Sequence, residues 1–150
     1  MWTLDERWHL HPCALGEPLG QALLATVNAE YGLATFHPQS RTSAILGDPT
    51  LRFFVTAPPR DLSAAKVGST VNLSWNAPPG SPTTFYVYRA TEMEGTFSAP
   101  LNSSPLLSTG YQDVGAPTGN KVYQVRAAER IVSGSGSFTN LSQGVFITIN

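Results

Sequence analysis

A short stretch near the middle of the chain, residues 70–75 (TVNLSW), constrains the fold more than any other. Its three apolar residues, Val71, Leu73 and Trp75, alternate with polar ones. This alternation places apolar side chains on one face of a β-strand and polar side chains on the other. The next residues, 76–82 (NAPPGSP), cannot continue a central strand, because proline has no N–H to donate to a neighbouring strand. We therefore expect a strand that ends at this turn, with Trp75 at the centre of the core.

An aromatic run, residues 85–89 (FYVYR), follows the turn. A strand, a turn rich in Pro and Gly, and a second strand together indicate a half-buried antiparallel sheet. Phe85 and Val87 are predicted to face the core, which leaves Tyr86 and Tyr88 on the outer face. These two tyrosines are a possible binding surface for a protein or a sugar. Aromatic residues on an outer face are also common simply because they suit β-structure.

The remaining C-terminal sequence repeats short alternating runs between turn signals. Seven such segments predict a β-sandwich. They are residues 62–67, 71–75, 85–88, an edge segment at 97–101, 107–111, 123–127, and a return that starts at 138 and ends at 145–149. Residues 113–120 are predicted to form a long turn, and Gly134 and Gly136 a loop.

The composition narrows the possible partners. The chain has 150 residues, of which 41% are hydrophobic and only 13% charged, and its formal net charge is −1. This balance gives no electrostatic reason to expect nucleic acid or an anionic membrane as a partner. No run approaches the roughly 20 apolar residues of a membrane span, so no membrane insertion is predicted. One cysteine, Cys13, allows no disulfide within the chain.

Residues 1–56 have a different pattern, which predicts a short α/β segment. Apolar residues from Leu19 to Val27 recur at helical spacing after Pro18, and predict a helix over 17–30 that Gly32 ends. Ile45 and Leu46 are predicted to end a buried strand, and Leu51, Phe53 and Val55 alternate as a further strand would. Residues 1–15 are predicted to form a short strand or an extended arm.

Two groups of residues in this segment could suggest chemistry. His9, His11 and Cys13 lie two apart, and imidazole and thiolate both bind zinc. Pro12 would break a strand, however, and structural zinc usually takes four ligands. We therefore favour the interpretation that these residues bind no metal. Asp48 precedes Pro49 and is interpreted as a turn residue, because no partner acid or base is evident. We predict no catalytic residues, no cofactor and no metal site.

Residues 57–150 resemble a fibronectin type III domain. The resemblance rests on Ala-Pro-Pro at 57–59, Leu62, Leu-Ser-Trp at 73–75, Tyr-Val-Tyr-Arg at 86–89, Tyr111 with Asp113, and Tyr-Gln-Val-Arg-Ala at 123–127. It implies a seven-stranded, immunoglobulin-like β-sandwich, and so a mainly β protein. It also implies that Tyr123 is the family's corner tyrosine, whose hydroxyl bonds to nearby backbone. All the residues that carry this resemblance are scaffold residues.

The end of the first segment resembles the C-terminal end of a gingipain-like, caspase-fold bacterial cysteine peptidase domain. The resemblance rests on Ile-Leu-Gly-Asp-Pro-Thr-Leu at 45–51 followed by Ala-Pro-Pro, and it covers residues 15–51 at most. The family's catalytic His-Gly pair is absent, and Cys13 stands in a different setting, His-Pro-Cys-Ala. The segment 1–56 is accordingly predicted to be the structural end of a peptidase-like domain without its chemistry.

Together these patterns favour a non-enzymatic protein. We expect a fibronectin type III spacer or adhesion module at the C-terminal end of an exported bacterial protein, in contact with protein or glycan. The alternative is an accessory segment that stabilises a gingipain-like peptidase domain upstream in a longer parent protein. The resemblances imply an extracellular or cell-surface location, although no signal peptide is visible in the chain. Asn72, Asn102 and Asn140 also match the glycosylation acceptor pattern.

Overall fold

The computed structural model of the chain describes residues 9–33, 46–80 and 83–150. It divides into two compact units, which are treated separately below. The smaller unit consists of Met1–Val55 together with Ile131–Phe138, and the larger of Thr56–Arg130 with Thr139–Asn150. The sequence predicts a single boundary between residues 56 and 57. A single boundary cannot assign Ile131–Phe138 to the smaller unit. Whether 57–150 folds as an autonomous domain stays a prediction.

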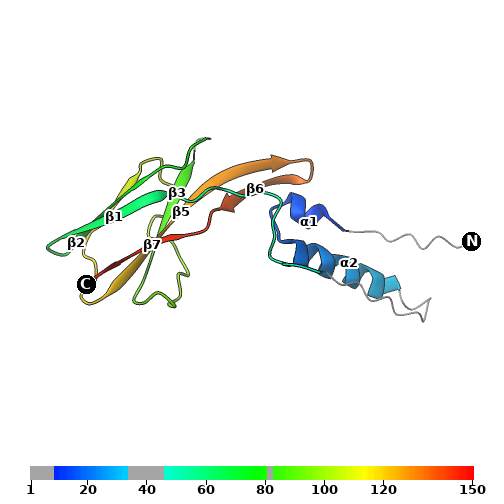
Figure 1. The fold of residues 1–150 in the computed structure, drawn as a ribbon, viewed down its shortest axis with the longest axis horizontal. Helices are drawn as coiled ribbons and strands as arrows, with labels where there is room; N and C mark the ends of the chain where they lie inside the picture. The colour runs from blue at the N-terminus through cyan, green and yellow to red at the C-terminus, as the bar shows by residue number, and fades with distance from the viewer. Residues whose placement is uncertain (1–8, 34–45, 81–82) are drawn as a thin grey trace, which may run out of the picture. The chain divides into compact units, whose positions relative to one another are not determined.

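The strands form a sandwich of two sheets (Figure 1). One sheet has the order β1-β2-β4, from β1 (Arg60–Val67), β2 (Thr70–Asn76) and β4 (Gly110–Asp113). In the other, β5 (Lys121–Ser133) lies between β3 (Thr84–Ala90) on one side and β6 (Gly136–Leu141) and β7 (Val145–Ile149) on the other. Neighbouring strands are antiparallel throughout the described pairings. The predicted seven-stranded, mainly β sandwich is confirmed.

Trp75 lies at the centre of the core, as the sequence predicts. Its side chain is 4% exposed and meets Phe85 edge to face, with ring centroids 5.4 Å apart. The predicted neighbours Leu62, Val87 and Tyr123 belong to the same cluster. The fully formed cluster joins inward residues of both sheets: Val71, Leu73, Trp75, Phe85, Val87, Tyr123, Val125 and Ala127.

The predicted edge segment at 97–101 follows β3 without becoming a strand. The N–H of Leu101 donates to the carbonyl of Val87, and Leu106 exchanges hydrogen bonds with Phe85. Between these points the side chain of Asn102 completes the edge: its Oδ1 accepts from the N–H of Val87, and its Nδ2 donates to the carbonyl of Phe85. A side chain thus pairs with backbone groups that would otherwise stay open at an exposed edge.

Two other strands differ from their predicted ranges. The strand expected at 107–111 begins only at Gly110, and Leu107 is 84% exposed. The last strand is split into β6 and β7, because Ser142 makes its hydrogen bonds to Ala127 from between them. A single interrupted partner strand therefore runs along most of β5.

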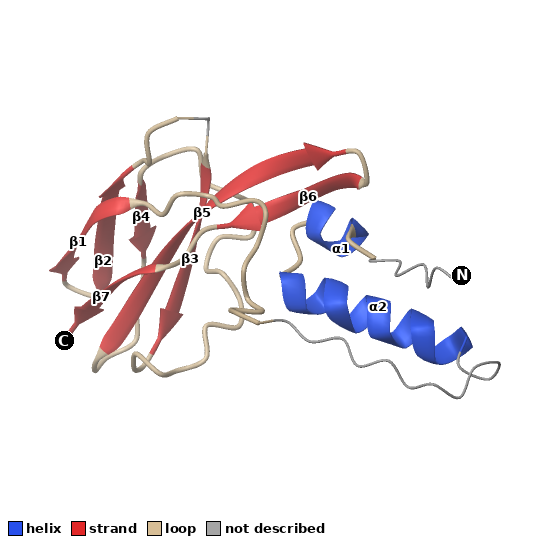
Figure 2. Cartoon of the chain, turned by 45° about the vertical axis from the view of Figure 1, so that its right-hand side comes forward, coloured by secondary structure: helices blue, strands red, loops and turns tan. Residues whose placement is uncertain are grey.

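The smaller unit contains the two described helices, α1 (His11–Ala14) and α2 (Leu19–Leu33), drawn in blue in Figure 2. Helix α2 confirms the helix predicted over 17–30 and continues one residue past Gly32. Its buried face is formed by Ala22 and Thr26. Thr26 also accepts a hydrogen bond from the N–H of His9, which fixes the chain just before α1.

The tip of the β5–β6 hairpin is also part of the smaller unit. The hydroxyl of Ser133 donates to the carbonyl of Ala14 at the end of α1. Phe138 packs edge to face against Phe54, with centroids 5.6 Å apart, and its ring lies where a side chain on Gly16 would have to go. The described residues between 9 and 55 therefore complete their packing with the distant segment Ile131–Phe138.

The strands predicted before residue 56 are absent from the described part of that segment. Leu46 is 99% and Phe53 62% exposed, and Ile45 lies outside the described residues. The backbone here pairs with a helix, since the carbonyls of Pro49 and Leu51 accept hydrogen bonds from the first amides of α2, at 2.8 Å each. Helix N-termini leave such amides without partners. The segment therefore caps a helix instead of pairing in a sheet.

The arm expected over residues 1–15 is also wrong for its described part. Residues 1–8 lie outside the described residues, and His11–Ala14 is helical. Pro12, interpreted as a strand breaker, stands in the first turn of α1, where a missing N–H costs no hydrogen bond.

The position of Trp75 predicts the effect of removing it. Trp75→Ala should lower the free energy of unfolding by about 3–5 kcal/mol, because it leaves a large cavity between the sheets. Trp75→Phe should cost much less, since a ring remains and the indole N–H has no acceptor among the described residues. Urea denaturation followed by circular dichroism measures both. A midpoint for Trp75→Ala equal to that of the unaltered chain would show that the strand register is wrong.

Candidate functional site

The outer face of the β3–β5–β7 sheet carries the two tyrosines singled out from the sequence. The strand register pairs Tyr86 with Arg126, and Tyr88 with Gln124, which in turn pairs with Phe146. Because the residues between them face the core, these side chains face outward. The structure thus adds three neighbours, Gln124, Arg126 and Phe146, that the sequence did not connect with Tyr86 and Tyr88.

The two tyrosines differ in how much of each is accessible. Tyr88 is only 8% exposed, whereas Tyr86 is half-buried. Burial raises the pKa of the Tyr88 hydroxyl, while the charge of Arg126 lowers it and Tyr86 raises it further. These influences place the three side chains within electrostatic reach of one another. Of the two, Tyr86 therefore has the more accessible side chain.

A loop contributes to the same face. Phe97, in the connection between β3 and β4, meets Phe146 edge to face, with centroids 5.7 Å apart and planes at 66°. The connection returns to the edge of β3 at Leu101. It therefore passes over the outer face as far as β7. Phe146 stays 42% exposed and Met93, earlier in the same loop, 48%.

The guanidinium of Arg126 is held in place on this face. Its Nε donates to the carbonyl of Ser142 at 2.7 Å, and it has no ion-pair partner among the described residues. Within the paired stretches of these strands, Arg126 is the one charged residue at an outward position, and Arg130 follows beyond the pairing with β3. The outward positions of the paired stretches are Thr84, Tyr86, Tyr88, Ala90, Val122, Gln124, Arg126, Ala128, Phe146 and Thr148.

Comparison with known proteins finds likenesses among solved structures. A scan against protein-family models and a search of curated proteins both returned no match. Among solved structures, an Fn3-like protein from Clostridium thermocellum is 33% identical, covering 60% of this chain and 88% of its own, with a TM-score of 0.42. An FN3 domain of human collagen XX is 18% identical, covering 64% of this chain and 95% of its own, with a TM-score of 0.38.

The identity to the Clostridium thermocellum protein agrees with the motifs quoted from the sequence and with the β1-β2-β4 and β3-β5-β7 sheets. The sandwich is a fibronectin type III-like domain. The likeness to a peptidase at residues 15–51 has no counterpart in these comparisons. It stays a prediction.

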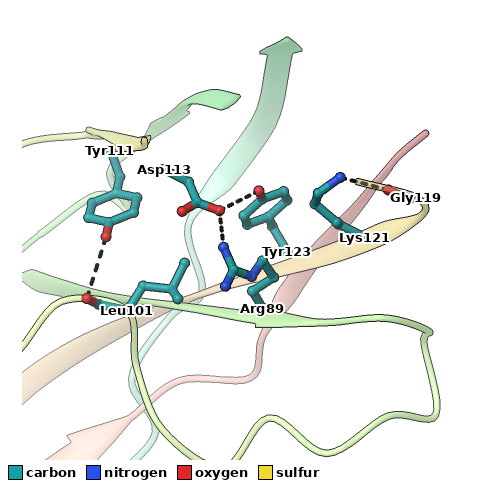
Figure 3. A network of polar contacts seen from close by, with 7 residues as sticks. All are labelled: Arg89, Leu101, Tyr111, Asp113, Gly119, Lys121 and Tyr123. Carbon is teal, nitrogen blue, oxygen red and sulfur yellow. Dashed lines mark hydrogen bonds and ion pairs between the residues drawn. The ribbon is translucent and has the colours of Figure 1, made fainter. Parts of the chain in front are cut away.

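A polar network joins the two sheets of the fibronectin type III-like domain (Figure 3). Asp113, at the end of β4, accepts hydrogen bonds from Arg89 of β3 at 2.5 Å and from the hydroxyl of Tyr123 of β5 at 2.6 Å, all at one oxygen. Asp113 is 7% and Tyr123 0% exposed. The resemblance implied a tyrosine hydroxyl bonded to backbone. The structure corrects this, because the acceptor is a carboxylate.

This network is structural. The acid, the base and the hydroxyl are satisfied by one another, and Asp113 ends β4 where the sequence predicted the start of a turn. Buried charges need such partners, and removing one partner of a buried pair typically costs about 3–5 kcal/mol. Lys121, next to it along β5, is likewise buried and donates to the carbonyl of Gly119 at 2.6 Å.

The other residues considered from the sequence do not converge. Cys13 is fully buried, whereas His11 is exposed on the same short helix, and His9 lies edge to face with His11. No group of three potential metal-binding side chains occurs in the described parts of the chain. Asp48 is confirmed as a turn residue: its Oδ1 accepts from the N–H and the hydroxyl of Thr50, and these bonds lower its pKa.

Two of the three acceptor-pattern asparagines are buried and hydrogen bonded. Asn102 and Asn140 are 7% and 5% exposed, and the amide of Asn140 donates to the hydroxyl of Thr56. Neither described α-helix has the length and apolar character of a membrane span.

The pKa of Tyr123 predicts how stability changes at alkaline pH. Burial, followed by the hydrogen bond to Asp113, raises this pKa well above its ordinary value. A raised pKa favours the neutral hydroxyl in the folded state, so its contribution is complete below about pH 10 and is lost as pH rises further.

The unfolding free energy should therefore fall steeply above pH 10, and Tyr123→Phe should make that fall shallower. Urea denaturation at pH 8, 10 and 11 measures the slopes. Part of the fall should remain in the variant, because burial also raises the pKa of Tyr88 and Tyr111. Identical slopes in the variant and the unaltered chain would contradict the assigned network.

Proposed function

We propose that the chain is a non-catalytic spacer or adhesion module of an exported bacterial protein, which contacts protein or glycan through the outer face of the β3–β5–β7 sheet. One observation carries the proposal: aromatic side chains from two strands and a loop converge there and remain partly exposed. Tyr86, Phe97 and Phe146 supply them. Aromatic residues with an arginine are the residue types most enriched at binding surfaces.

The opposite sheet makes a useful contrast. Its outward residues include Ser63, Ser74 and Gln112 but no aromatic side chain, and the two serine hydroxyls hydrogen bond to each other at 2.7 Å. Such a surface has few rigid side chains with large contact area. The aromatic sheet is therefore the favoured side for recognition within the described sandwich.

Export of the protein and its extracellular or cell-surface location are part of the same proposal. The family resemblance supports both, since this domain is used as a repeated external module. A domain used in that way needs no catalytic residues. The Arg89–Asp113–Tyr123 network supports the spacer aspect, because a cross-sheet link of buried polar groups stiffens the sandwich.

Binding to peptide and glycan arrays tests the proposal. The unaltered chain should bind a set of array members that the double variant Tyr86→Ser, Phe146→Ser loses by tenfold or more, because both exposed aromatic contacts are removed. A matched double variant on the other sheet, Gln112→Ala with Ser74→Ala, should bind as the unaltered chain does. If every bound member is retained by the aromatic variant, this face is not the recognition surface.

A second function is favoured by the smaller unit. Leu46, Leu51, Phe53 and Val55 are all more than half exposed, although they are apolar. Exposed apolar groups in one segment often mark a contact with another domain. The segment could thus be the accessory part of a gingipain-like peptidase domain in a longer parent protein. A His-Gly pair and a reactive cysteine encoded upstream would support this function, and their absence would remove it.

A further inference from the structure

Arg126 is the feature of the outer face that the aromatic contacts leave unexplained. Its guanidinium has five N–H donors, of which Nε is used by the carbonyl of Ser142. In the described part of the chain the two terminal nitrogens have no hydrogen-bond acceptor, and the neighbouring positions of β3, β5 and β7 carry no acidic residue. The half-buried charge is therefore both fixed in position and uncompensated.

The fixed Nε bond orients the rest of the group. A guanidinium is planar, so a hydrogen bond at Nε defines the plane in which the terminal nitrogens lie. Two parallel N–H donors in such a plane match the two oxygens of a carboxylate. Tyr86 lies directly across from Arg126 in the strand register, so a group bound there would contact an aromatic ring as well.

The surrounding surface favours a protein over an acidic sugar. Sugars stack on flat, exposed ring faces, whereas Phe97 and Phe146 pack against each other at 66°, so that the edge of one ring covers a face of the other. Met93 adds a flexible apolar side chain that is 48% exposed, and Gln124 covers the space above Gly144. Apolar side chains of a peptide fit such an uneven surface.

We propose that this face recognises a protein segment in which an Asp or Glu side chain is flanked by apolar residues. Its carboxylate pairs with Arg126, and the flanking residues contact Tyr86 and Phe146. The proposal rests on the proposed function, because it names the partner of the same face. Charge complementarity carries it: Arg126 is pinned at Nε and has no ion-pair partner among the described residues, and none of the paired strand positions around it is acidic.

Selection from a displayed library of random 12-residue peptides on the full chain tests the proposal. Peptides retained by the unaltered chain should be enriched in an Asp or Glu with apolar neighbours. Their affinity should fall by tenfold or more in Arg126→Gln and remain partly in Arg126→Lys, which keeps the charge but loses the planar fork. Binding should weaken with added salt. Arg60→Gln, the same change at an exposed arginine on β1, should have no effect.

The outcomes separate the two proposals. Peptides that depend on Tyr86 but bind Arg126→Gln equally well would overturn the carboxylate proposal and leave the binding face intact. Peptides that depend on neither residue would overturn both. A hyaluronan oligosaccharide serves as the acidic-sugar probe. Binding that depends on Arg126, in the absence of any acidic peptide, would show that the partner is a glycan and would overturn the protein assignment.

Discussion

The contact between Trp75 and Phe85 determines which side of each strand faces the core and which faces outward. The two rings meet between the sheets, with centroids 5.4 Å apart, and bring β2 and β3 together across the core. Because side chains alternate along a strand, fixing Phe85 inward directs Tyr86 outward. A slip of one residue in β3 would exchange the buried and the exposed sets. The position of the proposed recognition face is thus a consequence of core packing.

Buried polar side chains form hydrogen bonds that the pairing of the strands does not supply. Asn102 pairs with the backbone at the edge of β3, and Asp113 ties the last residues of β4 to Arg89 and Tyr123 of the other sheet. Both are buried, so their hydrogen bonds form away from water, where an unmade bond is costly. These anchors protect one edge and one end of the sandwich. They leave the outer face of β3, β5 and β7 as the side with partly exposed aromatic residues.

The sequence predicts the sandwich well because its signals are local. The alternation of apolar and polar residues is enough to predict that Trp75 and Phe85 face the core. The partner strands need not be known. The helix before residue 33 is equally local. Arg126 and Phe146, by contrast, join Tyr86 only through the pairing register, which no local pattern contains. The predicted strand from Leu51 to Val55 is wrong for a related reason: its alternation is real, but no strand among the described residues pairs with it, and its backbone caps α2.

Hydroxyl-radical footprinting with mass spectrometry tests the central claim, the register that places a recognition face on the β3–β5–β7 sheet, most directly. Side chains react with the radical according to their exposure to solvent. The account predicts rapid oxidation of Phe146 and Tyr86, slow oxidation of Tyr88, and protection of Phe85 and Tyr123 until the chain unfolds. Oxidation of Phe85 or Tyr123 at the rate of Tyr86 in the folded chain would contradict it.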